Sequence, residues 1–411
     1  MSRRNAVSQR GGGPEPPLTT LGGKSVNPVG RVISRQHLVM TKIFSKVSRG
    51  LGLALVCWTL GLAPAIAAEP RAVVVARGLE SPWALAFLPD GRMLVTERTG
   101  RIRLVGSDGR LGVALGGTPP VDAVGQCGML DVAIDPKFAQ NRLIYWSYAQ
   151  PGMAGNTLAV ARGRLEGERL EDVQVIFQQR PEVRSQLHCG SRLAFAPDGR
   201  LFIGLGDRYF RKDDAQDPGN TLGKIVRIEP DGRVPADNPF AQRAGARPEI
   251  WSLGHRNIQG LALHPLTGEL WHTEHGPQGG DELNRIEPGR NYGWPLITYG
   301  RNYGTGTRIG EEGPREGFEQ PLHHWVPTSI APSGLAFVTS DRYPGWKGSL
   351  LVGALRGQAL HRLSLEGRKV VGEQRLLAAL GARIRDVRQG PDGWIYLLTD
   401  AASGQILRLE P

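Results

Sequence analysis

Two arginines near the C-terminus, Arg383 and Arg385, have a spacing that suits anion binding. In a strand, residues two apart direct their side chains to the same face, so the two guanidinium groups would lie side by side. Like charges at that separation repel unless an anion lies between them, and arginine binds carboxylates through two parallel hydrogen bonds. The pair therefore predicts a carboxylate-binding site, although a solvated strand face shows the same spacing.

Nine histidines supply candidates for a general base, because the unperturbed pKa of imidazole suits proton removal near neutral pH. The glycine-rich segment 275–294 offers carboxylate and carbonyl oxygens without cysteine, which favours a hard cation such as Ca²⁺ over zinc. The segment contains no Asp-x-Asp-x-Asp calcium loop, and an ordinary turn with a surface acid is the alternative interpretation.

The elements that must position these groups repeat along the chain. Residues 86–95 (AFLPDGRMLV) and 194–203 (AFAPDGRLFI) are near copies, each with an apolar strand, a Pro-Asp-Gly turn and a second apolar strand. Weaker copies lie at 132–136, 261–265, 335–352 and 389–396. Six copies without a sustained helical period predict an all-β chain, a six-bladed β-propeller whose long loops form the active site at one end of the channel. Strands at 72–76 and 405–409 are expected to complete one blade and so close the ring.

The charge distribution argues against a polyanionic partner. The chain has 50 Lys+Arg and 39 Asp+Glu residues, which give a net charge of +11. Residues 1–68 contain nine of the basic residues and one of the acidic residues, so residues 69–411 carry a net charge of only +3. We therefore expect no nucleic-acid partner. A hydrophobic fraction of 40% excludes a disordered chain, and three cysteines are too few for a disulfide scaffold.

The start of the chain has the pattern of an export signal. A basic stretch precedes the apolar run 51–63 (LGLALVCWTLGLA), and Ala65-Ile66-Ala67 follows as a cleavage site. The run is too short for a comfortable membrane span, so we expect no stable membrane anchor; a buried helix is the alternative. We interpret 1–39 as a disordered upstream extension, 40–67 as a secretory signal peptide and 69–411 as the propeller domain of a periplasmic or secreted protein.

Six short motifs resemble one family when taken together. They are residues 125–131 (GQCGMLD), 187–193 (LHCGSRL), 253–260 (LGHRNIQG), 274–282 (EHGPQGGDE), 291–295 (NYGWP) and 383–387 (RIRDV). This set, in this order, resembles the soluble sugar dehydrogenases that use pyrroloquinoline quinone (PQQ), nearest the periplasmic aldose sugar dehydrogenase branch, over about 75–408. The resemblance implies oxidation of the anomeric hydroxyl of aldoses to lactones, with electrons passed to an external acceptor.

The resemblance also assigns roles to individual residues. His188 corresponds to the general base, and Arg256 and Asn257 correspond to the residues that contact the quinone oxygens, where Arg256 also stabilises developing charge. By the same resemblance, the cofactor carboxylates bind to Arg356, Arg383 and Arg385, and the sugar binds to Gln126 and Tyr303. One Ca²⁺ binds to the carbonyls of Gly276 and Pro277. A second metal position consists of Glu282 and the backbone oxygen of Tyr292.

Two departures from the family pattern stand out. Leu187 replaces the aspartate that precedes the base in glucose-preferring members, which favours a broad aldose range. Cys127 and Cys189 directly follow Gln126 and His188, and they are the only cysteines left after export to an oxidising compartment. We predict a disulfide between them that pins two active-site loops together; two unpaired small residues are the alternative.

Two other functions remain open at this point. A propeller can bind a sugar or a protein without catalysis, and a Ca²⁺-dependent lactonase can share the same architecture. The chain has no Cys-x-x-Cys-His haem motif, so electrons would leave through a separate partner. The preferred sugar, and whether the protein is a monomer or a dimer, do not follow from the residues.

Overall fold

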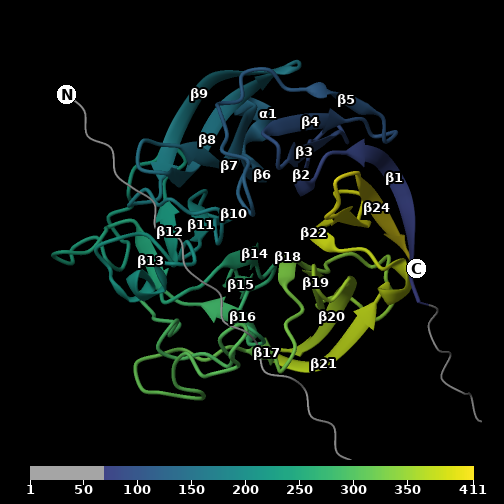
Figure 1. The fold of residues 1–411 in the computed structure, drawn as a ribbon. Coiled ribbons are helices and arrows are strands. Elements are labelled where there is room, and N and C mark those ends of the chain that lie inside the picture. The colour runs from purple at the N-terminus through teal and green to yellow at the C-terminus, as the bar shows by residue number, and fades with distance from the viewer. Residues whose placement is uncertain (1–68) are drawn as a thin grey trace, which may run out of the picture. The chain divides into compact units, whose positions relative to one another are not determined.

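The computed structural model describes residues 69–411, which form six four-stranded antiparallel sheets. The sheets are arranged as blades around a central axis, with the first strand of each blade innermost (Figure 1). The predicted six-bladed β-propeller is therefore confirmed. The predicted extension 1–39 and signal peptide 40–67 lie outside the described residues. Within the described part, no helix is long and apolar enough to cross a membrane.

The blades are numbered here in chain order, each from the innermost strand outward. Blade 1 contains β2 (Pro82–Phe87), β3 (Met93–Glu97), β4 (Arg101–Val105) and β5 (Leu111–Ala114). Blade 2 contains β6 (Met129–Ile134), β7 (Leu143–Pro151), β8 (Asn156–Glu166) and β9 (Arg169–Gln178). Blade 3 contains β10 (Gly190–Phe195), β11 (Leu201–Leu205), β12 (Lys224–Ile228) and β13 (Ile250–Leu253).

The second half of the ring follows the same plan. Blade 4 contains β14 (Ile258–Leu263), β15 (Leu270–Glu274), β16 (Asp281–Ile286) and β17 (His323–Trp325). Blade 5 contains β18 (Pro332–Phe337), β19 (Leu350–Ala354), β20 (Ala359–Glu366) and β21 (Lys369–Leu376). Blade 6 contains β22 (Ile384–Gln389), β23 (Ile395–Thr399), β24 (Gly404–Glu410) and β1 (Arg71–Leu79). Three short helical turns lie between strands: α1 (Phe138–Asn141), η1 (Lys212–Gln216) and η2 (Ala378–Leu380).

The sequence repeats coincide with the hairpin between the first and second strands of each blade. In blades 1 and 3 the turn is closed by a hydrogen bond from the amide of Leu88 to the carbonyl of Arg92, and from Ala196 to Arg200, both 2.8 Å. Gly91 and Gly199 have φ angles of 85° and 86°, a conformation that residues with a Cβ rarely adopt. This requirement explains why the Pro-Asp-Gly signal recurs where it does.

Strand β1 closes the ring. It pairs antiparallel with β24 from Arg71 opposite Glu410 to Leu79 opposite Gly404, and so the two ends of the described chain share blade 6. The predicted strands at 72–76 and 405–409 lie inside this pair, and the expected closure is confirmed. β24 is thereby paired on both sides, with β23 and with β1, and β1 becomes the outer strand of blade 6.

Each innermost strand carries a register shift close to its first residue. Such bulges leave an extra residue unpaired and change the direction of its side chain. In the six blades the shifts fall at or beside residues that lie around the central axis: Trp83, Asp131, Arg192, Gln259, Ser333 and Arg385. The bulges therefore convert a repetitive fold into a ring of six side chains of five different kinds.

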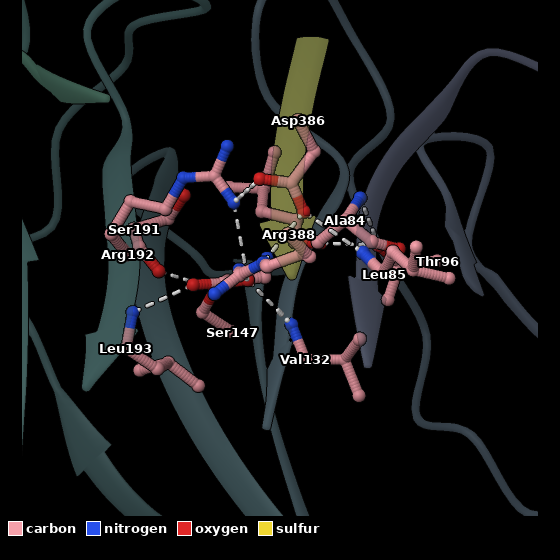
Figure 2. A network of polar contacts seen from close by, with 12 residues as sticks. Ala84, Leu85, Thr96, Val132, Ser147, Ser191, Arg192, Leu193, Asp386 and Arg388 are labelled. Atoms are coloured by element: carbon pink, nitrogen blue, oxygen red, sulfur yellow. Dashed lines mark hydrogen bonds and ion pairs between the residues drawn. The ribbon is translucent and has the colours of Figure 1, made fainter. Parts of the chain in front are cut away.

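Four charged side chains from blades 2, 3 and 6 join these strands across the axis (Figure 2). Arg192 lies 3.3 Å from Asp131 and 2.9 Å from Asp386, and Arg388 lies 2.9 Å and 3.0 Å from the same two carboxylates. Asp386 also accepts the amide of Leu85 on β2, at 3.0 Å. Two positive and two negative groups thus neutralise one another; three of the side chains are buried, and that of Arg388 is 25% exposed.

Replacing Arg192 with methionine is expected to destabilise the propeller by about 3–5 kcal/mol, because it leaves Asp131 and Asp386 buried with half of their positive charge removed. Urea unfolding of residues 69–411 measures this. The matched control is Arg110→Met, since the Arg110 side chain is 86% exposed and its removal leaves no buried charge. A loss no larger than that of the control would contradict the assignment.

Candidate active site

Two adjoining cavities open at one end of the channel. The first, called the arginine pocket, has a volume of about 350 Å³ and is lined by Arg98, Arg383, Arg385, Asn257, Gln259 and Cys189 among others. The second, called the histidine pocket, has a volume of about 250 Å³ and is lined by His188, Tyr209, Arg256, Gly276, Tyr303 and Arg356 among others. Gln126, His275 and Ala331 line both. The two therefore form one continuous cleft.

A shared strand direction explains why these residues meet. The cleft residues lie at the N-terminal ends of first strands, as Asn257 and Arg383 do, or just after the C-terminal ends of second strands, as His275 and Arg356 do. In an antiparallel hairpin those ends are adjacent. The blades thus present their variable loops to a single end of the channel.

Arg383 and Arg385 converge as their spacing predicts, and a protein carboxylate already lies between them. Asp400 accepts from Arg383 Nε at 2.7 Å and from Arg385 Nη2 at 3.2 Å. Arg385 also donates to Gln259 Oε1 at 3.1 Å, and burial lowers its pKa. The single negative charge of Asp400 does not neutralise both Arg383 and Arg385, so the arginine pocket keeps a net positive charge and can still accept an anion.

His188 is held by a carboxylate that sequence analysis did not identify. Its Nδ1 lies 2.6 Å from Asp207 Oδ1, and Asp207 Oδ2 accepts from Trp294 Nε1 at 2.8 Å. An ionised Asp207 accepts the Nδ1 proton, so the tautomer that this pair selects carries its lone pair on Nε2. His188 has a φ of 48°, a strained conformation for a residue with a side chain. Such strain persists only where surrounding contacts enforce it.

The electrostatic surroundings keep His188 neutral. Burial lowers its pKa, the guanidinium of Arg256 lowers it further, and Asp207 opposes both. Burial alone would raise the pKa of Asp207, but His188 and Arg256 hold it below its usual value. An unprotonated imidazole beside an ionised carboxylate is able to accept a proton from a hydroxyl group.

Arg256 and the loop after β15 form the next wall of the cleft. Arg256 Nη1 donates to the carbonyls of His275 at 2.8 Å and Gly276 at 2.6 Å. This loop therefore directs carbonyl oxygens towards positive charge, as a hard cation requires. Pro277 lines an outer extension of the cleft beside His188 and Arg256.

Both predicted substrate residues line the histidine pocket together with His188. Gln126 Oε1 accepts the backbone amide of His188 at 2.9 Å, so its amide nitrogen is the group left for a ligand. The ring of Tyr303 is 54% exposed and lines the histidine pocket. Leu187, at the position of the family's aspartate, lines the same pocket with an apolar side chain.

The two cysteines form a disulfide in this structure, with a Cα–Cα distance of 5.8 Å. Cys127 and Cys189 are buried. The bond joins the loop before β6 to the loop before β10, directly beside Gln126 and His188. It therefore restrains the same two segments that the Gln126–His188 hydrogen bond connects.

Glu282 and Tyr292 form the second predicted metal position, at which the backbone oxygen of Tyr292 is the expected ligand. The hydroxyl of Tyr292 donates to the carbonyl of Arg285 at 2.7 Å and accepts the amide of Glu287 at 2.9 Å, so it is already satisfied. Glu282 accepts from Asn284 at 3.0 Å, and burial together with the charge of Glu274 raises its pKa to about 8. A nearby cation would counter that shift, and the hydrogen bonds of the Tyr292 hydroxyl do not involve the backbone oxygen that is the expected ligand.

The residues that sequence analysis missed are partners of those it found. Asp207 and Asp400 each follow the second strand of a blade, and Trp294 lies in the 291–295 motif without an assigned role. The sequence signal that could have identified Asp207 and Asp400 is their position just after the second strand of a blade, where other cleft residues lie. Neither carboxylate has a motif of its own, because its significance lies in which arginine or histidine the fold brings to it.

The comparisons with known proteins agree with this geometry. Residues 79–408 match the model of the Glucose / Sorbosone dehydrogenase family. The chain belongs to this family. Aldose sugar dehydrogenase YliI of Escherichia coli (strain K12) is 45% identical over 359 residues, which cover 85% of this chain and 96% of the relative.

Solved structures of the family have the same fold. A glucose dehydrogenase crystal structure is 49% identical, with a TM-score of 0.80 over 82% of this chain and 99% of that one. The PQQ-bound aldose sugar dehydrogenase of Streptomyces coelicolor is 32% identical, with a TM-score of 0.68 over 84% and 98% of the two chains. Membership of a sugar dehydrogenase family and the propeller fold thus rest on both sequence and structure.

The disulfide predicts a definite thiol count. Unreduced, denatured protein comprising residues 69–411 is expected to react with no thiol reagent, and to take up two equivalents after reduction, because Cys127 and Cys189 are its only cysteines. Mass spectrometry of the alkylated protein measures both states. Two free thiols before reduction would show that the bond does not form.

Proposed function

We propose that this protein is a PQQ-dependent aldose sugar dehydrogenase that oxidises the anomeric hydroxyl of a broad range of aldoses to lactones. The observation that supports it most directly is the neutral, Asp207-oriented His188 at one end of a cleft whose other end is an arginine pocket. The family membership and the PQQ-bound relative support the same assignment.

The residues of the arginine pocket fit a planar quinone with three carboxylates. Arg98, Arg383 and Arg385 contribute three positive charges against the single charge of Asp400. Arg356 adds an exposed guanidinium that, within residues 69–411, has no side-chain hydrogen bond or ion pair. Asn257 Oδ1 is occupied by the amide of Gly190 at 3.2 Å, so its amino group is left to donate to a quinone oxygen.

The chain's own groups then determine the chemistry. His188 Nε2 takes the proton of the anomeric hydroxyl, and Asp207 stabilises the imidazolium that forms. Gln126 orients the sugar, and Arg256 stabilises negative charge that develops beside it. When bound, PQQ accepts the hydride that leaves the anomeric carbon, so the sugar loses two electrons and two hydrogens and becomes a lactone.

Calcium, the electron acceptor and the location of the protein belong to the same proposal. Carbonyls of Gly276 and Pro277 would hold a Ca²⁺ that polarises the cofactor, and Glu282 with the Tyr292 carbonyl would hold a second. The segment 40–67 would direct export to the periplasm or beyond. Electrons would pass to a separate acceptor, and the protein would act as a monomer or dimer without a membrane anchor.

Reconstitution with PQQ and Ca²⁺ is expected to produce dye-linked aldose oxidation that His188→Ala lowers by about 10²–10⁴-fold, the usual contribution of a general base. His264→Asn is the control, since His264 lies at the opposite end of β14 from Asn257. PQQ binding, followed by absorbance, should survive in both variants.

Other outcomes would identify a different function. Failure of PQQ to bind would refute the proposal. Hydrolysis of a lactone with Ca²⁺ alone would show a lactonase, and sugar binding without oxidation in the PQQ-loaded protein would show a binding module.

The pH profile tests the pairing of His188 with Asp207. Because the pKa of His188 is lowered from 6.5, turnover should persist below pH 6.5 and be lost only as falling pH protonates the base. Asp207→Asn removes a charge that raises this pKa, so the acidic limb should move to still lower pH while kcat falls by about 10²–10⁴-fold. Asp341→Asn, at an 84% exposed carboxylate, should change neither. A limb that moves to higher pH in Asp207→Asn would contradict the pairing.

A further inference from the structure

A buried group of two histidines and a glutamate lies in blade 4, outside the cleft. His255, His272 and Glu274 each have a ligand atom within 4.8 Å of the other two, and their exposed fractions are 0%, 0% and 4%. His272 and Glu274 are two apart on β15 and therefore share a face of the sheet, and His255 comes from the loop between β13 and β14. No role has been assigned to this group above.

Hydrogen bonding alone satisfies the group poorly. His272 Nε2 lies 3.3 Å from Glu274 Oε1, a long contact, and His255 Nδ1 lies 3.6 Å from the same oxygen and has no hydrogen-bond partner within residues 69–411. His272 Nδ1 is also buried without a partner there. Buried polar atoms in native proteins are normally paired, so each of these needs an explanation.

The charge on Glu274 is likewise unmatched. In the described part of the chain, no Lys or Arg side chain forms an ion pair with it, and the groups in contact with its Oε1 are the two imidazoles. The nearby ammonium of Lys224 is committed to three carbonyls, those of Asp214, Ala215 and Leu222. A buried carboxylate without a cation is costly, and Glu282 on β16, directly opposite Glu274, adds a second carboxyl group to this face.

We propose that His255 Nδ1, His272 Nε2 and Glu274 Oε1 bind a divalent transition-metal ion of the zinc class. Two imidazoles and one carboxylate are a common donor set for Zn²⁺, and bonds of about 2.0–2.1 Å place tetrahedral ligand atoms about 3.3 Å apart. The contacts of 3.3 Å and 3.6 Å to Glu274 Oε1 are close to that spacing. A cation bound between the three atoms would replace the long His272–Glu274 hydrogen bond with two metal–ligand bonds, and it would give the unpaired Nδ1 of His255 a third.

The outer contacts of His255 and Glu274 fit the same role. His255 Nε2 lies 2.8 Å from Ser252 Oγ, and donation to that hydroxyl leaves the lone pair on Nδ1, where the metal would lie. The second oxygen of Glu274 accepts the backbone amide of Arg256, at 2.5 Å. The metal would therefore join the two segments that carry Arg256 and His275 into the cleft. This site differs in residues and in ligand chemistry from the oxygen-only calcium positions proposed above.

Metal analysis of the full mature chain tests the proposal without using the sugar reaction. Protein produced with added zinc chloride, without PQQ, and then dialysed should retain one zinc ion per chain by mass spectrometric elemental analysis. His272→Asn and Glu274→Gln should lose it, whereas His264→Asn in the same blade and His188→Gln in the cleft should keep it. Retention of zinc in His272→Asn, or its loss in His188→Gln, would overturn the assignment.

A spectroscopic measurement covers the case in which those variants fail to fold. Wild-type protein produced with cobalt in place of zinc should show the visible absorption of a low-coordinate Co²⁺ with nitrogen ligands. Removal of the metal with a strong chelator should lower the thermal midpoint, because an ion that binds only the folded state stabilises it. A colourless protein that binds neither ion stoichiometrically would refute the site, whatever the outcome of the PQQ reconstitution.

Discussion

The mutual neutralisation of four charged side chains on the propeller axis, three of them buried, is the interaction on which the other features depend. Arg192 and Arg388 are shared between Asp131 and Asp386, which ties blades 2, 3 and 6 together and, through the amide of Leu85, reaches blade 1. Buried ions are tolerated only when geometry and hydrogen bonding offset their desolvation. Here the ring geometry supplies the offset, since only a closed ring brings these strands face to face.

The same network supports the floor of the active-site cleft. Arg192 Nε donates to the carbonyl of Gln259 at 2.6 Å, and its Nη2 donates to the carbonyl of Arg385 at 3.2 Å. The side chains of Gln259 and Arg385 bond to each other above those carbonyls. A structural ion cluster and a ligand pocket are thus consecutive layers of one channel. Residues at the bulges contribute to both layers, because each bulge changes the direction of side chains on an innermost strand.

Prediction from sequence succeeded where the signal is local. Short apolar strands and Pro-Asp-Gly turns depend on near neighbours in the chain, so the six hairpins and the ring that they imply followed from residues 86–95 and their copies. The motifs around His188, Arg256 and Arg383 likewise lie in short segments, and the fold gathers them at one cleft. Their partners were not predicted, because Asp207 and Asp400 acquire meaning only through contacts with residues 15 to 19 positions away on another strand or loop.

What the sequence determined by itself was the kind of fold, the family and the candidate residues of the cleft, since these depend on repeat, turn chemistry and motif. Only the tertiary structure decided how those residues are tuned. It set His188 in a strained backbone against Asp207, placed Asp400 between the two arginines, and gathered His255, His272 and Glu274 into one buried group. The physical reason is that burial and through-space charge set protonation and ligand binding, and neither quantity exists until distant strands have packed.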